Sequence, residues 1–466
     1  MIVKPTYQLE LFMPHFRPIN RNTDQFATLA MNEHLPKHRL ALFVVETVGQ
    51  MDLKEIEDSY GTGGSAAYHP AIMFGILIFG YATGTFSSRK LEYATHDSVS
   101  FQYVAANERP DHDTINQFRL RFLNEFKSLM IQVLMTAKVM KMLNLFNLAV
   151  DGTKLHANAS RHSALSYGHI GKLEVKLTEE VERLMVLAEE SNREKVPKGM
   201  NVAEEIILRK DRLTTMAAAK TVLEQRAAER YELESAEYAE KLAQREAKAK
   251  ESGKPARGKE PKAPVEGARD KDQINLTDAE SRIMKTPGGG FEQCYNGQIS
   301  VDMDSMLIVT TDVVQACNDK QQIEPVLQHI NGLPDELGKV GNLAADTGYF
   351  SERNAVASAA QGIVPLIAEK RESHHPDPLE RFEEPPPLKR DATVLEAMRH
   401  LLKTMTGKGI YAKRKSTVEP VFGIIKAIMG FRQFSLRGLE KVRGEFNLVA
   451  LAWNIKRMAV LRQNFA

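Results

Sequence analysis

The predicted strands of this chain fall into two groups that are far apart in the sequence. The first is a single apolar run that ends at Val150 and is followed at once by Asp151. The second group begins near Phe291, after the charged region 170–289. A carboxylate at the end of a buried strand is costly unless it has a partner, so Asp151 is predicted to have a function. The fold must also accommodate a long insertion after this strand.

The second group alternates strands with helices. The predicted elements are strands over 297–304 and 305–315, a helix over 320–333, a strand ending at Asp346, a helix over 351–362 capped by Ser351, a strand over 362–368 and a helical block from 416. Sequential strands followed by strand–helix alternation predict an α/β domain with a mixed sheet and helices on its faces. We assign residues 141–169 and 290–466 to this domain.

Residues 170–289 are predicted to form a helical insertion. The stretch from about 170 to 250 is rich in Glu, Lys, Ala and Leu. A seam like that of a coiled coil is formed by Leu173, Leu177, Val181, Leu184 and Ala188. This pattern indicates a long antiparallel helix pair. The following stretch, 245–272, has no large apolar residue except Val265 and is predicted to be a disordered, mobile linker.

Residues 1–140 predict an all-helical N-terminal domain. An apolar helix has Pro70 in its first turn and Gly84 after its end. A second, shorter helix follows and exposes Arg89 and Lys90. The pattern has two interpretations: a helix-turn-helix-like module that binds DNA, or an ordinary small helical domain.

A third helix is predicted over 110–134, with Asp113 or Thr114 as its N-cap. One face of this helix would carry Ile115, Phe118, Phe122 and Phe126.

Composition is ordinary for a soluble globular protein, with 43% hydrophobic and 26% charged residues. The two cysteines, Cys294 and Cys317, form no CxxC motif, which fits a reducing compartment. The N-terminus lacks the apolar region of a signal peptide. The longest apolar stretch, 71–82, is too short to span a bilayer. We therefore expect a cytoplasmic, nucleoid-associated protein with no membrane partner.

The net charge of +2 conceals a basic C-terminal region. Residues 386–466 carry 16 Lys and Arg against 5 Asp and Glu, a net charge of +11. A basic region on an otherwise balanced chain predicts a polyanionic partner, with nucleic acid first in line. The alternative is a solvated helical tail rich in basic residues.

Three acids have similar settings. Asp151 and Asp346 each end an apolar strand, and functional groups gather at the carboxyl ends of strands in α/β sheets. Glu419 opens the basic terminal block. Converging carboxylates repel one another, and Mg²⁺ would offset this repulsion. Two such ions roughly 4 Å apart can stabilise the attacking and leaving oxygens of phosphoryl transfer. Mn²⁺ is expected to substitute.

Each acid also has a purely structural interpretation. Asp151 could cap a turn before Gly152, and Asp346 could begin an Asx-turn. Glu419 could close a capping box with Ser416.

Basic residues surround Glu419 and favour a functional role for it. Lys413, Arg414 and Lys415 precede it, and Lys426 and Arg432 follow. Lys426 lies seven residues after Glu419, two helical turns on, so the two are predicted to share a helix face. An acid beside such cations suits a phosphate backbone.

Other residues have simpler interpretations. Asp302 and Asp304 are better explained by a hairpin turn than by metal binding. His156 could contact phosphate or metal, or lie on the surface. Trp453 and Phe431 could stack on a base, although a helix core explains them better. His69, His96, His112, His374 and His375 show no zinc spacing with cysteine.

Several motifs resemble those of the DDE-type transposases of bacterial insertion sequences. They are the block from "HPAIMFGILIFGYATG" to "HDTINQFRLRF", "VDGTKLHANAS", "GGGFEQCYNGQISVDMD", "NDKQQIEPVL", "ADTGYFSERN" and the terminal "STVEPVFGIIKAIMGFRQFSLRGLEKVRGEF". The resemblance implies an RNase H-like catalytic core. It implies that Asp151, Asp346 and Glu419 are the three acids and that Lys426 is the lysine two turns after the glutamate.

The chain departs from the family pattern at two points. The Tyr and Arg that often precede the glutamate are out of step here, where Tyr411, Arg414 and Lys415 stand nearby. The long insertion after Asp151 also exceeds what a minimal core needs.

The resemblance implies a transposase that cleaves phosphodiester bonds at element ends and joins the 3′-OH ends to target DNA. Its partners would be double-stranded DNA, as terminal repeats and target, and a second copy of the chain in a homodimer or higher oligomer. The predicted DNA-binding residues are Lys426, Arg414, Lys415, Arg432, Arg437, Arg89 and Lys90. Two alternatives remain: a catalytically inactive DNA-binding derivative, and a metal-dependent nuclease without strand transfer.

Overall fold

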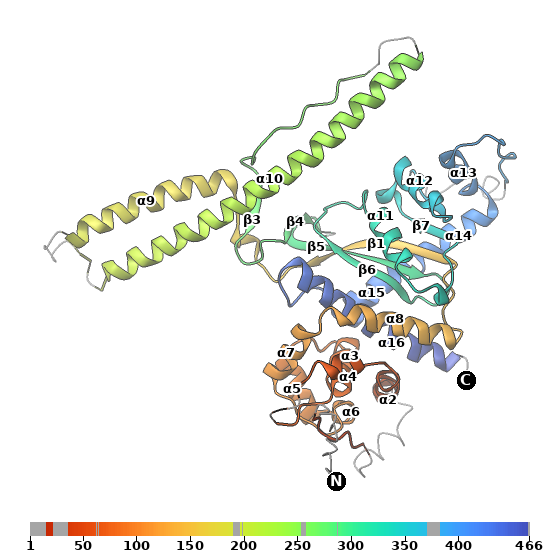
Figure 1. Ribbon diagram of the computed structural model, residues 1–466, viewed down its shortest axis with the longest axis horizontal. Coiled ribbons are helices and arrows are strands. Elements are labelled where there is room, and N and C mark those ends of the chain that lie inside the picture. Colours follow the sequence, from red (N-terminus) through yellow and green to blue (C-terminus); the bar gives the residue numbers. More distant parts are fainter. Residues whose placement is uncertain are drawn as a thin grey trace, which may run out of the picture. The chain divides into compact units, whose positions relative to one another are not determined.

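The computed structural model describes residues 15–21, 36–61, 63, 65–189, 196–197, 199–252, 258–286, 288–370 and 383–464 (Figure 1). The chain divides into two compact units. The core unit combines Met1–His156 with Tyr295–Ala466, and the insertion unit is Ala157–Cys294. The insertion unit therefore interrupts the core unit directly after its first strand, within wider bounds than the predicted insertion 170–289.

The core unit contains a mixed sheet. Its strands are β1 (Asn147–His156), β5 (Phe291–Asp302), β6 (Ile308–Val314), β7 (Asn342–Ala345) and β8 (Val364–Ile367). Strand β5 lies between β6 and β1, and β7 and β8 continue the sheet beyond β1. Strands β1, β7 and β8 run parallel, whereas β5 and β6 pair antiparallel. The predicted mixed sheet is confirmed, and it is consistent with an RNase H-like domain.

The first four residues of β5 belong to the insertion unit. There they pair antiparallel with β4 (Arg282–Lys285).

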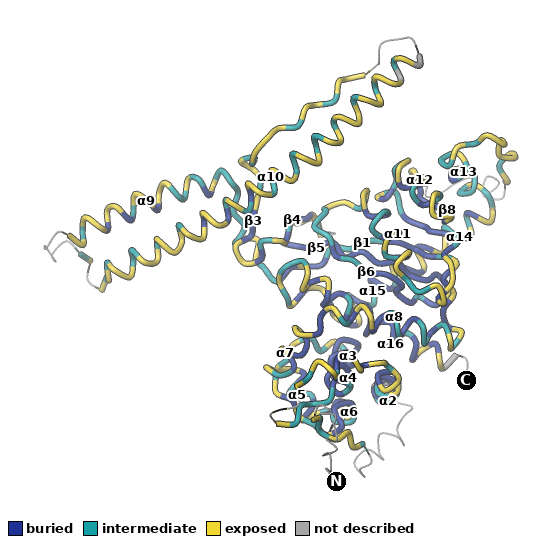
Figure 2. Tube along the Cα trace, in the orientation of Figure 1, coloured by how far each residue is buried: buried dark blue, intermediate teal, exposed yellow. Residues whose placement is uncertain are grey.

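Helices of the second half of the chain pack around this sheet. They are α11 (Ile323–Asn331), α12 (Glu352–Ala360), α13 (Val394–Leu401), α14 (Met405–Lys415), α15 (Val418–Gly423), the π-helical turn η5 (Ile424–Ile428) and α16 (Leu439–Asn464). Helices α11 and α16 pack on β6, and α12 packs on β8. The strand residues from Leu148 to Val150 and from Leu343 to Ala345 are fully buried (Figure 2). Burial on both faces explains why residues 148–150 of β1 and 343–345 of β7 are continuous apolar runs in the sequence.

The N-terminal part of the core unit is helical, as predicted. Its helices are α2 (Pro36–Gly49), α3 (Lys54–Asp58), α4 (Pro70–Thr83), α5 (Ser88–Asp97), α6 (Val99–Val104), α7 (His112–Arg121) and α8 (Glu125–Val139). Helix α4 begins at Pro70 and ends at Gly84, whose φ of 85° is the left-handed conformation that favours glycine. The helix predicted over 110–134 is instead two helices, α7 and α8. Asp111, rather than Asp113 or Thr114, caps α7.

The predicted aromatic face of that segment is correct, because Ile115, Phe118, Phe122 and Phe126 are all buried. These side chains keep α7 and α8 on one core although the helix between them is broken.

A buried polar network joins the N-terminal helices to the C-terminal helix. The hydroxyl of Tyr81 on α4 donates to Glu445 Oε1 on α16 at 3.0 Å, and Arg119 Nη1 on α7 donates to the Tyr81 oxygen at 3.2 Å. The backbone N–H groups of Ser435 and Leu436 both donate to Glu445 Oε2 at 3.0 Å. The predicted N-terminal domain 1–140 is therefore part of the same compact unit as the sheet.

The insertion unit is built on a helical hairpin. Helix α9 (Tyr167–Glu189) packs on α10 (Val202–Ser252). Three of the predicted seam residues, Leu177, Val181 and Leu184, are buried. Glu180 pairs with Arg209 at 2.7 Å and Glu174 with Lys220 at 3.0 Å, as an antiparallel arrangement requires. At the base of the hairpin, β2 (Ala164–Ser166) pairs antiparallel with β3 (Gln273–Asn275).

The structure differs from the predicted linker over 245–272. Helix α10 continues to Ser252, and residues 258–272 lie along it. Arg245 donates to the carbonyl of Lys259 at 3.0 Å, and Arg230 Nη1 pairs with Asp272 at 2.9 Å. Residues 253–257 lie outside the described residues. Arginine contacts with the returning backbone replace the apolar contacts that the sequence lacks.

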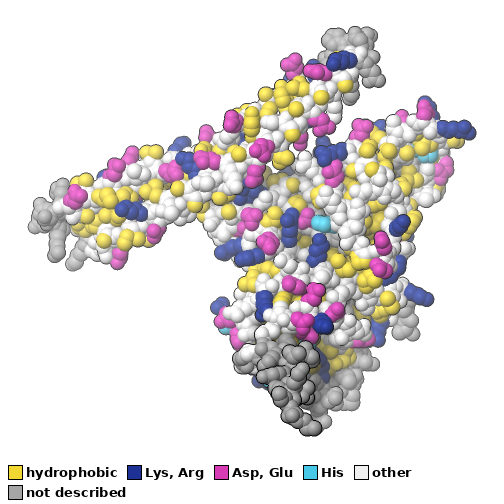
Figure 3. Space-filling view, viewed as in Figure 1, with side chains coloured by type: hydrophobic (Ala, Val, Ile, Leu, Met, Phe, Trp, Pro, Cys, Tyr) yellow, Lys and Arg dark blue, Asp and Glu magenta, His cyan; other side chains and the backbone are white. Residues whose placement is uncertain are grey.

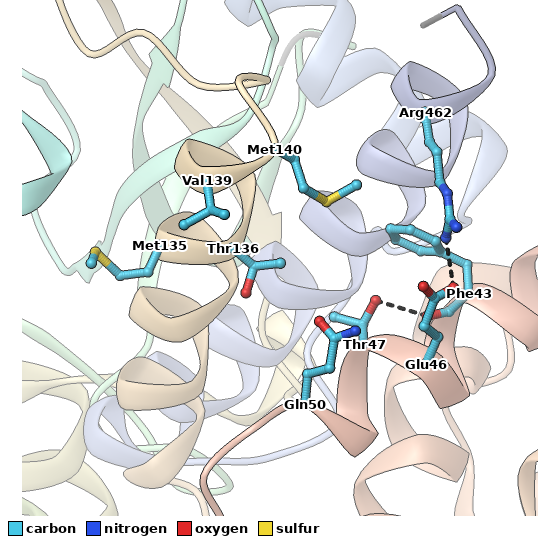
Figure 4. A pocket seen from close by; sticks show the side chains of 9 residues that line it. All are labelled: Phe43, Glu46, Thr47, Gln50, Met135, Thr136, Val139, Met140 and Arg462. Atoms are coloured by element: carbon cyan, nitrogen blue, oxygen red, sulfur yellow. Dashed lines mark hydrogen bonds and ion pairs between the residues drawn. The ribbon is translucent and has the colours of Figure 1, made fainter. Parts of the chain in front are cut away.

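A cavity of about 470 Å³ opens between α2, α8 and α16 (Figure 4). It is lined by Phe43, Glu46, Thr47, Gln50, Met135, Thr136, Val139, Met140 and Arg462. Glu46 and Arg462 form an ion pair of 2.6 Å at this cavity. None of the predicted site residues lines it.

Across the described part of the chain, no single helix has the length and apolar character needed to cross a membrane. One pair, α4 and α5, meets the criteria together but is bent by 98°.

Candidate active site

Asp151 and Asp346 are neighbours on two adjacent interior strands of the sheet, β1 and β7. In the parallel pairing of β1 with β7, Val150 lies opposite Ala345, and each acid follows one of these two residues. Strand β7 ends at Ala345, directly before Asp346, whereas β1 continues past Asp151 to His156, so the prediction that Asp151 ends its strand is wrong. The matched register of the two strands still brings the two carboxylates together. The prediction that both acids belong to one site agrees with this placement.

Both carboxylates also accept a hydrogen bond from a nearby backbone N–H. Asp346 Oδ1 accepts from Gly348 N at 2.8 Å and caps the 3₁₀ turn η4 (Thr347–Tyr349). Asp151 Oδ1 accepts from Gly152 N at 2.9 Å. The Asx-turn interpretation of Asp346 is therefore confirmed, whereas the turn-cap interpretation of Asp151 is wrong, because Asp151 and Gly152 both lie within β1. These two hydrogen bonds leave the second oxygen of each carboxylate available for another role.

Burial makes the charge on Asp151 costly. Desolvation raises the pKa of Asp151 to about 7, and the carboxylates of Asp346 and Asp319 act in the same direction. The guanidinium of Arg414 opposes this shift. The position therefore favours a cation close to Asp151.

Arg414 links the first acid to the third. Its Nη1 lies 3.7 Å from Asp151 Oδ2, and its Nη2 lies 3.5 Å from Glu419 Oε1. The Arg414 side chain is only 6% exposed, whereas that of Glu419 is 54% exposed. The Nε and Nη1 atoms of Arg414 have no hydrogen-bond partner among the described residues. A buried guanidinium with unbonded donors is suited to an anionic ligand.

The capping-box interpretation of Glu419 is wrong. Helix α15 begins at Val418, and its N-cap, Thr417, makes no side-chain cap hydrogen bond. Ser416 Oγ instead donates to the carbonyl of Lys413 at 3.0 Å, at the end of α14. The contact with Arg414 is therefore the described interaction of the Glu419 carboxylate.

A fourth acid, Asp319, lies close to Asp151 and Asp346 and was not assigned from the sequence. Its Oδ1 accepts hydrogen bonds from Asn296 Nδ2 at 2.7 Å and from Gln298 Nε2 at 2.6 Å. Both donors are buried on β5. Asp319 belongs to the "NDKQQIEPVL" motif, which carried the family resemblance without a role for this residue. Its position depends on β5 and could not be read from the local pattern.

Polar contacts continue from Asp319 to the turn after Asp346. The hydroxyl of Tyr349 donates to Gln298 Oε1. Burial, together with the nearby acids, raises the pKa of Tyr349 well above its ordinary value, so this hydroxyl keeps its proton. A Cβ atom at position 152 would lie 2.2 Å from Gln298 Nε2 and 2.7 Å from Asp319 Oδ1, so a larger residue there would displace this hydrogen-bonded pair.

Lys426 reaches the strand that carries Asp151. Its Nζ donates to Thr153 Oγ1 at 2.5 Å and to the carbonyl of Lys154 at 2.9 Å. The helix that was expected to be continuous changes at Ile424 into the π-helical turn η5, which contains Lys426. Such turns occur often at functional sites. Lys426 therefore contacts the two residues of β1 that lie two and three positions after Asp151.

The other predicted DNA-binding residues lie on the surface. Arg89 and Lys90 are exposed on α5, and Lys415, Arg432 and Arg437 are exposed near the start and end of the terminal block. Figure 3 shows one face of the molecule, with Lys and Arg side chains in dark blue. Two further cations of this block already have acidic partners: Lys413 contacts Asp304 at 3.3 Å, and Arg443 contacts Asp312 at 2.8 Å.

The remaining candidates have structural roles. Asp302 Oδ2 accepts hydrogen bonds from the N–H and the hydroxyl of Ser305, which supports the hairpin-turn interpretation. His156 is exposed at the end of β1, where its backbone bridges to Gln433. Trp453 and Phe431 are buried in the core. His374 and His375 lie outside the described residues.

The donor chemistry of this site fits a divalent cation. Within the described ranges, no group of three His, Cys, Asp or Glu side chains stands close enough to hold a metal ion. Mg²⁺ does not need such a cage, because it commonly uses one or two carboxylates, substrate phosphates and its own waters. Asp151 and Asp346 supply such a pair of hard oxygen donors. The buried Arg414 would face the phosphate.

Two segments of the chain match known protein families. Residues 388–459 match the family described as Transposase DDE domain. Residues 30–121 match the family described as Transposase domain (DUF772). The first match includes Arg414, Glu419 and Lys426, and the second includes Arg89 and Lys90. A search of curated proteins and a search of solved structures found no match.

Proposed function

The chain is a DDE-type transposase of an insertion element, and we propose that it cleaves phosphodiester bonds at the element ends and transfers the 3′-OH ends to target DNA. The observation that carries the proposal is that Asp151 and Asp346 directly follow paired residues of the adjacent strands β1 and β7. Arg414 bridges from Asp151 to Glu419 at the same site. Carboxylates for cations and a guanidinium for phosphate are the groups that phosphoryl transfer requires.

Asp151, Asp346 and Glu419 would hold the divalent cations. When bound, these ions stabilise the attacking and leaving oxygens of the displacement. Arg414 would donate from its unbonded Nη1 and Nε to a non-bridging phosphate oxygen. Lys426, held by Thr153 and Lys154, would fix the strand after Asp151 and add positive charge beside the phosphate.

We propose that the partner is double-stranded DNA. Arg89 and Lys90 on α5 would contact the terminal repeat, and helices α5 to α7 would act as a helix-turn-helix-like module. The exposed Lys415, Arg432 and Arg437 would neutralise phosphates of the element or the target.

Two copies of the chain would act together, because two element ends must be cut and joined. The hairpin of the insertion unit offers a contact surface for the second copy. Its Val186, Ile207 and Leu208 side chains are 54%, 58% and 56% exposed. A monomeric protein–DNA complex in light scattering would contradict this part of the proposal.

Substitution of the acids tests the catalytic proposal. Asp151→Asn, Asp346→Asn and Glu419→Gln should each lower Mg²⁺-dependent cleavage of DNA carrying the element ends by at least about a thousandfold, while DNA binding persists. Asp335→Asn, at an exposed acid on the core unit, is the matched control and should cleave normally. Wild-type cleavage by any of the three variants would remove that residue from the site.

The products separate the proposal from its alternatives. A transposase yields cut ends joined to a second DNA molecule, whereas a nuclease yields cut ends alone. An inactive DNA-binding derivative yields neither product in Mg²⁺ or Mn²⁺.

The salt dependence of binding tests the DNA contacts. Arg437→Ala should lower the magnitude of the log–log salt slope by about one, since each phosphate contact on duplex DNA contributes roughly 0.9 to the slope. Arg443→Ala is the control, because Arg443 is paired with Asp312. Equal slopes for wild type and Arg437→Ala would exclude that contact.

A further inference from the structure

Asp319 is the acid of this site for which the proposed mechanism has no use. We propose that Asp319 is a fourth acid of the catalytic centre and that its negative charge strengthens the binding of a divalent cation by Asp151 and Asp346. The proposal rests on the proposed function, since it assigns a new residue to the same centre.

The Asp319 carboxylate is held in a fixed orientation. Its Oδ1 receives two amide donors, Asn296 Nδ2 at 2.7 Å and Gln298 Nε2 at 2.6 Å. Asn296 and Gln298 are 0% and 1% exposed. They alternate along β5 and therefore project from the same face of the sheet. Two buried donors on one oxygen prevent the carboxylate from turning away to solvent.

The fixed carboxylate lies close to the glycines that stand just after the two proposed ligands, Gly152 in β1 and Gly348 in the turn η4. A Cβ atom at Gly152, next to Asp151, would lie 2.7 Å from Asp319 Oδ1. A Cβ atom at Gly348, in the turn capped by Asp346, would lie 3.8 Å from Asp319 Oδ2. One oxygen thus faces the strand residue after Asp151, and the other faces the turn capped by Asp346.

Anchoring alone does not explain a carboxylate at this position. An asparagine could accept the same two amide hydrogen bonds through its side-chain oxygen. The chain instead places a third negative charge beside Asp151 and Asp346, and like charges at close range are unfavourable. Throughout the described residues, neither Asp319 nor Asp346 forms an ion pair with a basic side chain. The negative charge therefore exceeds what the protein itself neutralises.

The other side of the centre independently indicates a ligand. Arg414 is 5% exposed, its Nε and Nη1 lack hydrogen-bond partners among the described residues, and Nη1 lies 3.7 Å from Asp151. Excess carboxylate on one side and an unbonded guanidinium on the other match a cation together with a phosphate group.

Asp319 would act through the water shell of the cation. As noted above, three acids do not converge within metal-binding range in the described residues. Mg²⁺ and similar ions keep several waters, and a neighbouring carboxylate can accept hydrogen bonds from them. Removing an outer partner of this kind typically weakens metal binding by about 10–100-fold. Asp319 is thus a positioning residue and not a direct ligand.

The test measures Mn²⁺ binding to the full-length protein by titration calorimetry and by the paramagnetic resonance of free Mn²⁺. Asp319→Asn keeps the acceptor for Asn296 and Gln298 but removes the charge. Its affinity for Mn²⁺ should fall by about 10–100-fold. Its metal-free melting temperature should be equal to or higher than that of the wild type, since a repulsive charge has gone. Asp319→Glu should recover part of the affinity, and Asp335→Asn should bind as the wild type does.

A structural role for Asp319 would give the opposite pattern. An Asp319→Asn protein that fails to fold, or that melts lower in the absence of metal and binds Mn²⁺ as the wild type does, overturns the inference. Asp151→Asn separates this outcome from failure of the proposed function. If Asp151→Asn loses Mn²⁺ binding while Asp319→Asn retains it, only the role of Asp319 is wrong. If the wild-type protein binds no Mn²⁺, the metal-dependent function itself fails.

Discussion

Charged side chains are used differently in the two units. In the insertion unit, oppositely charged residues pair along the outside of a helical hairpin. The side chains of Arg209 and Glu180 are 25% and 23% exposed, and their ion pair is 2.7 Å long. In the core unit, Glu445 is fully buried and Arg414 is 5% exposed. The first arrangement keeps the charges near water, whereas the second removes them from it.

The exposed ion pairs of the insertion unit and the buried charges of the core unit are expected to contribute differently to stability. Exposed ion pairs typically contribute about 0–1 kcal/mol, so the hairpin of the insertion unit is held mainly by its apolar seam. A buried charge costs several kcal/mol unless its partners satisfy it. Glu445 is satisfied by Tyr81 and by backbone N–H groups, and it ties distant parts of the chain together. The Nε and Nη1 atoms of Arg414, by contrast, have no hydrogen-bond partner among the described residues, which leaves them able to bind an anion.

The largest effect should come from removing Glu445. Glu445→Ala leaves the buried hydroxyl of Tyr81 and the partly buried N–H groups of Ser435 and Leu436 without their acceptor. It should lower the free energy of unfolding by about 3–5 kcal/mol, measured by urea denaturation. Glu440→Ala, at an exposed position on the same helix, should change it by less than about 0.5 kcal/mol. Equal losses in the two variants would remove the distinction between buried and exposed charge.

The next effect is a dependence of stability on pH in the absence of metal. The pKa of Asp151 is raised from 3.8 to about 7 in the folded protein, chiefly by burial. The folded state therefore keeps a proton that the unfolded chain loses. Stability from this group is complete below about pH 4 and is lost as pH rises to 7, by up to about 4 kcal/mol. Asp302, whose pKa is raised to about 6 by burial, acts in the same direction.

The measurement compares urea denaturation at pH 5 and pH 7.5 in the presence of EDTA. The decline between these pH values should be clearly smaller in Asp151→Asn, which has no proton to lose. A decline as steep as that of the wild type would place the responsible group elsewhere.

The smallest effect should come from the hairpin of the insertion unit. Arg209→Ala removes contacts with Glu180 and Glu205 that remain close to solvent. The melting temperature should change little, and any change should shrink further at high salt. A fall in melting temperature as large as that of Glu445→Ala would mean that this ion pair behaves like the buried charges of the core unit.

The sequence predicted the features that depend on local pattern. Asp151 and Asp346 each follow a short apolar run. Both runs are strand residues buried on both faces of the sheet, as predicted. Gly84 ends α4 because only the left-handed conformation completes that turn. Three of the five predicted seam residues of α9 are buried because the seam has helical spacing.

Features that depend on tertiary contacts were missed. Asp319 lies outside any strand or helix, and its role follows from amide donors on β5. The family spacing placed Arg414 out of step, yet the fold brings it between Asp151 and Glu419. The break between α7 and α8 interrupts a continuous helical sequence pattern. The aromatic side chains on both sides of the break are buried in the same core.

The insertion between β1 and the other strands of the sheet affects how the chain folds during its synthesis. Asn147 on β1 and Asn342 on β7 share a hydrogen bond of 2.7 Å although 195 residues separate them. At a synthesis rate of about 5–20 residues per second, roughly 10 to 40 seconds pass between the emergence of these two strands from the ribosome. During that interval β1 lacks its neighbour β7, and its other neighbour, β5, emerges only after helices α9 and α10. Glu419 emerges later still, so the newly made chain completes its set of acids only when synthesis is nearly finished.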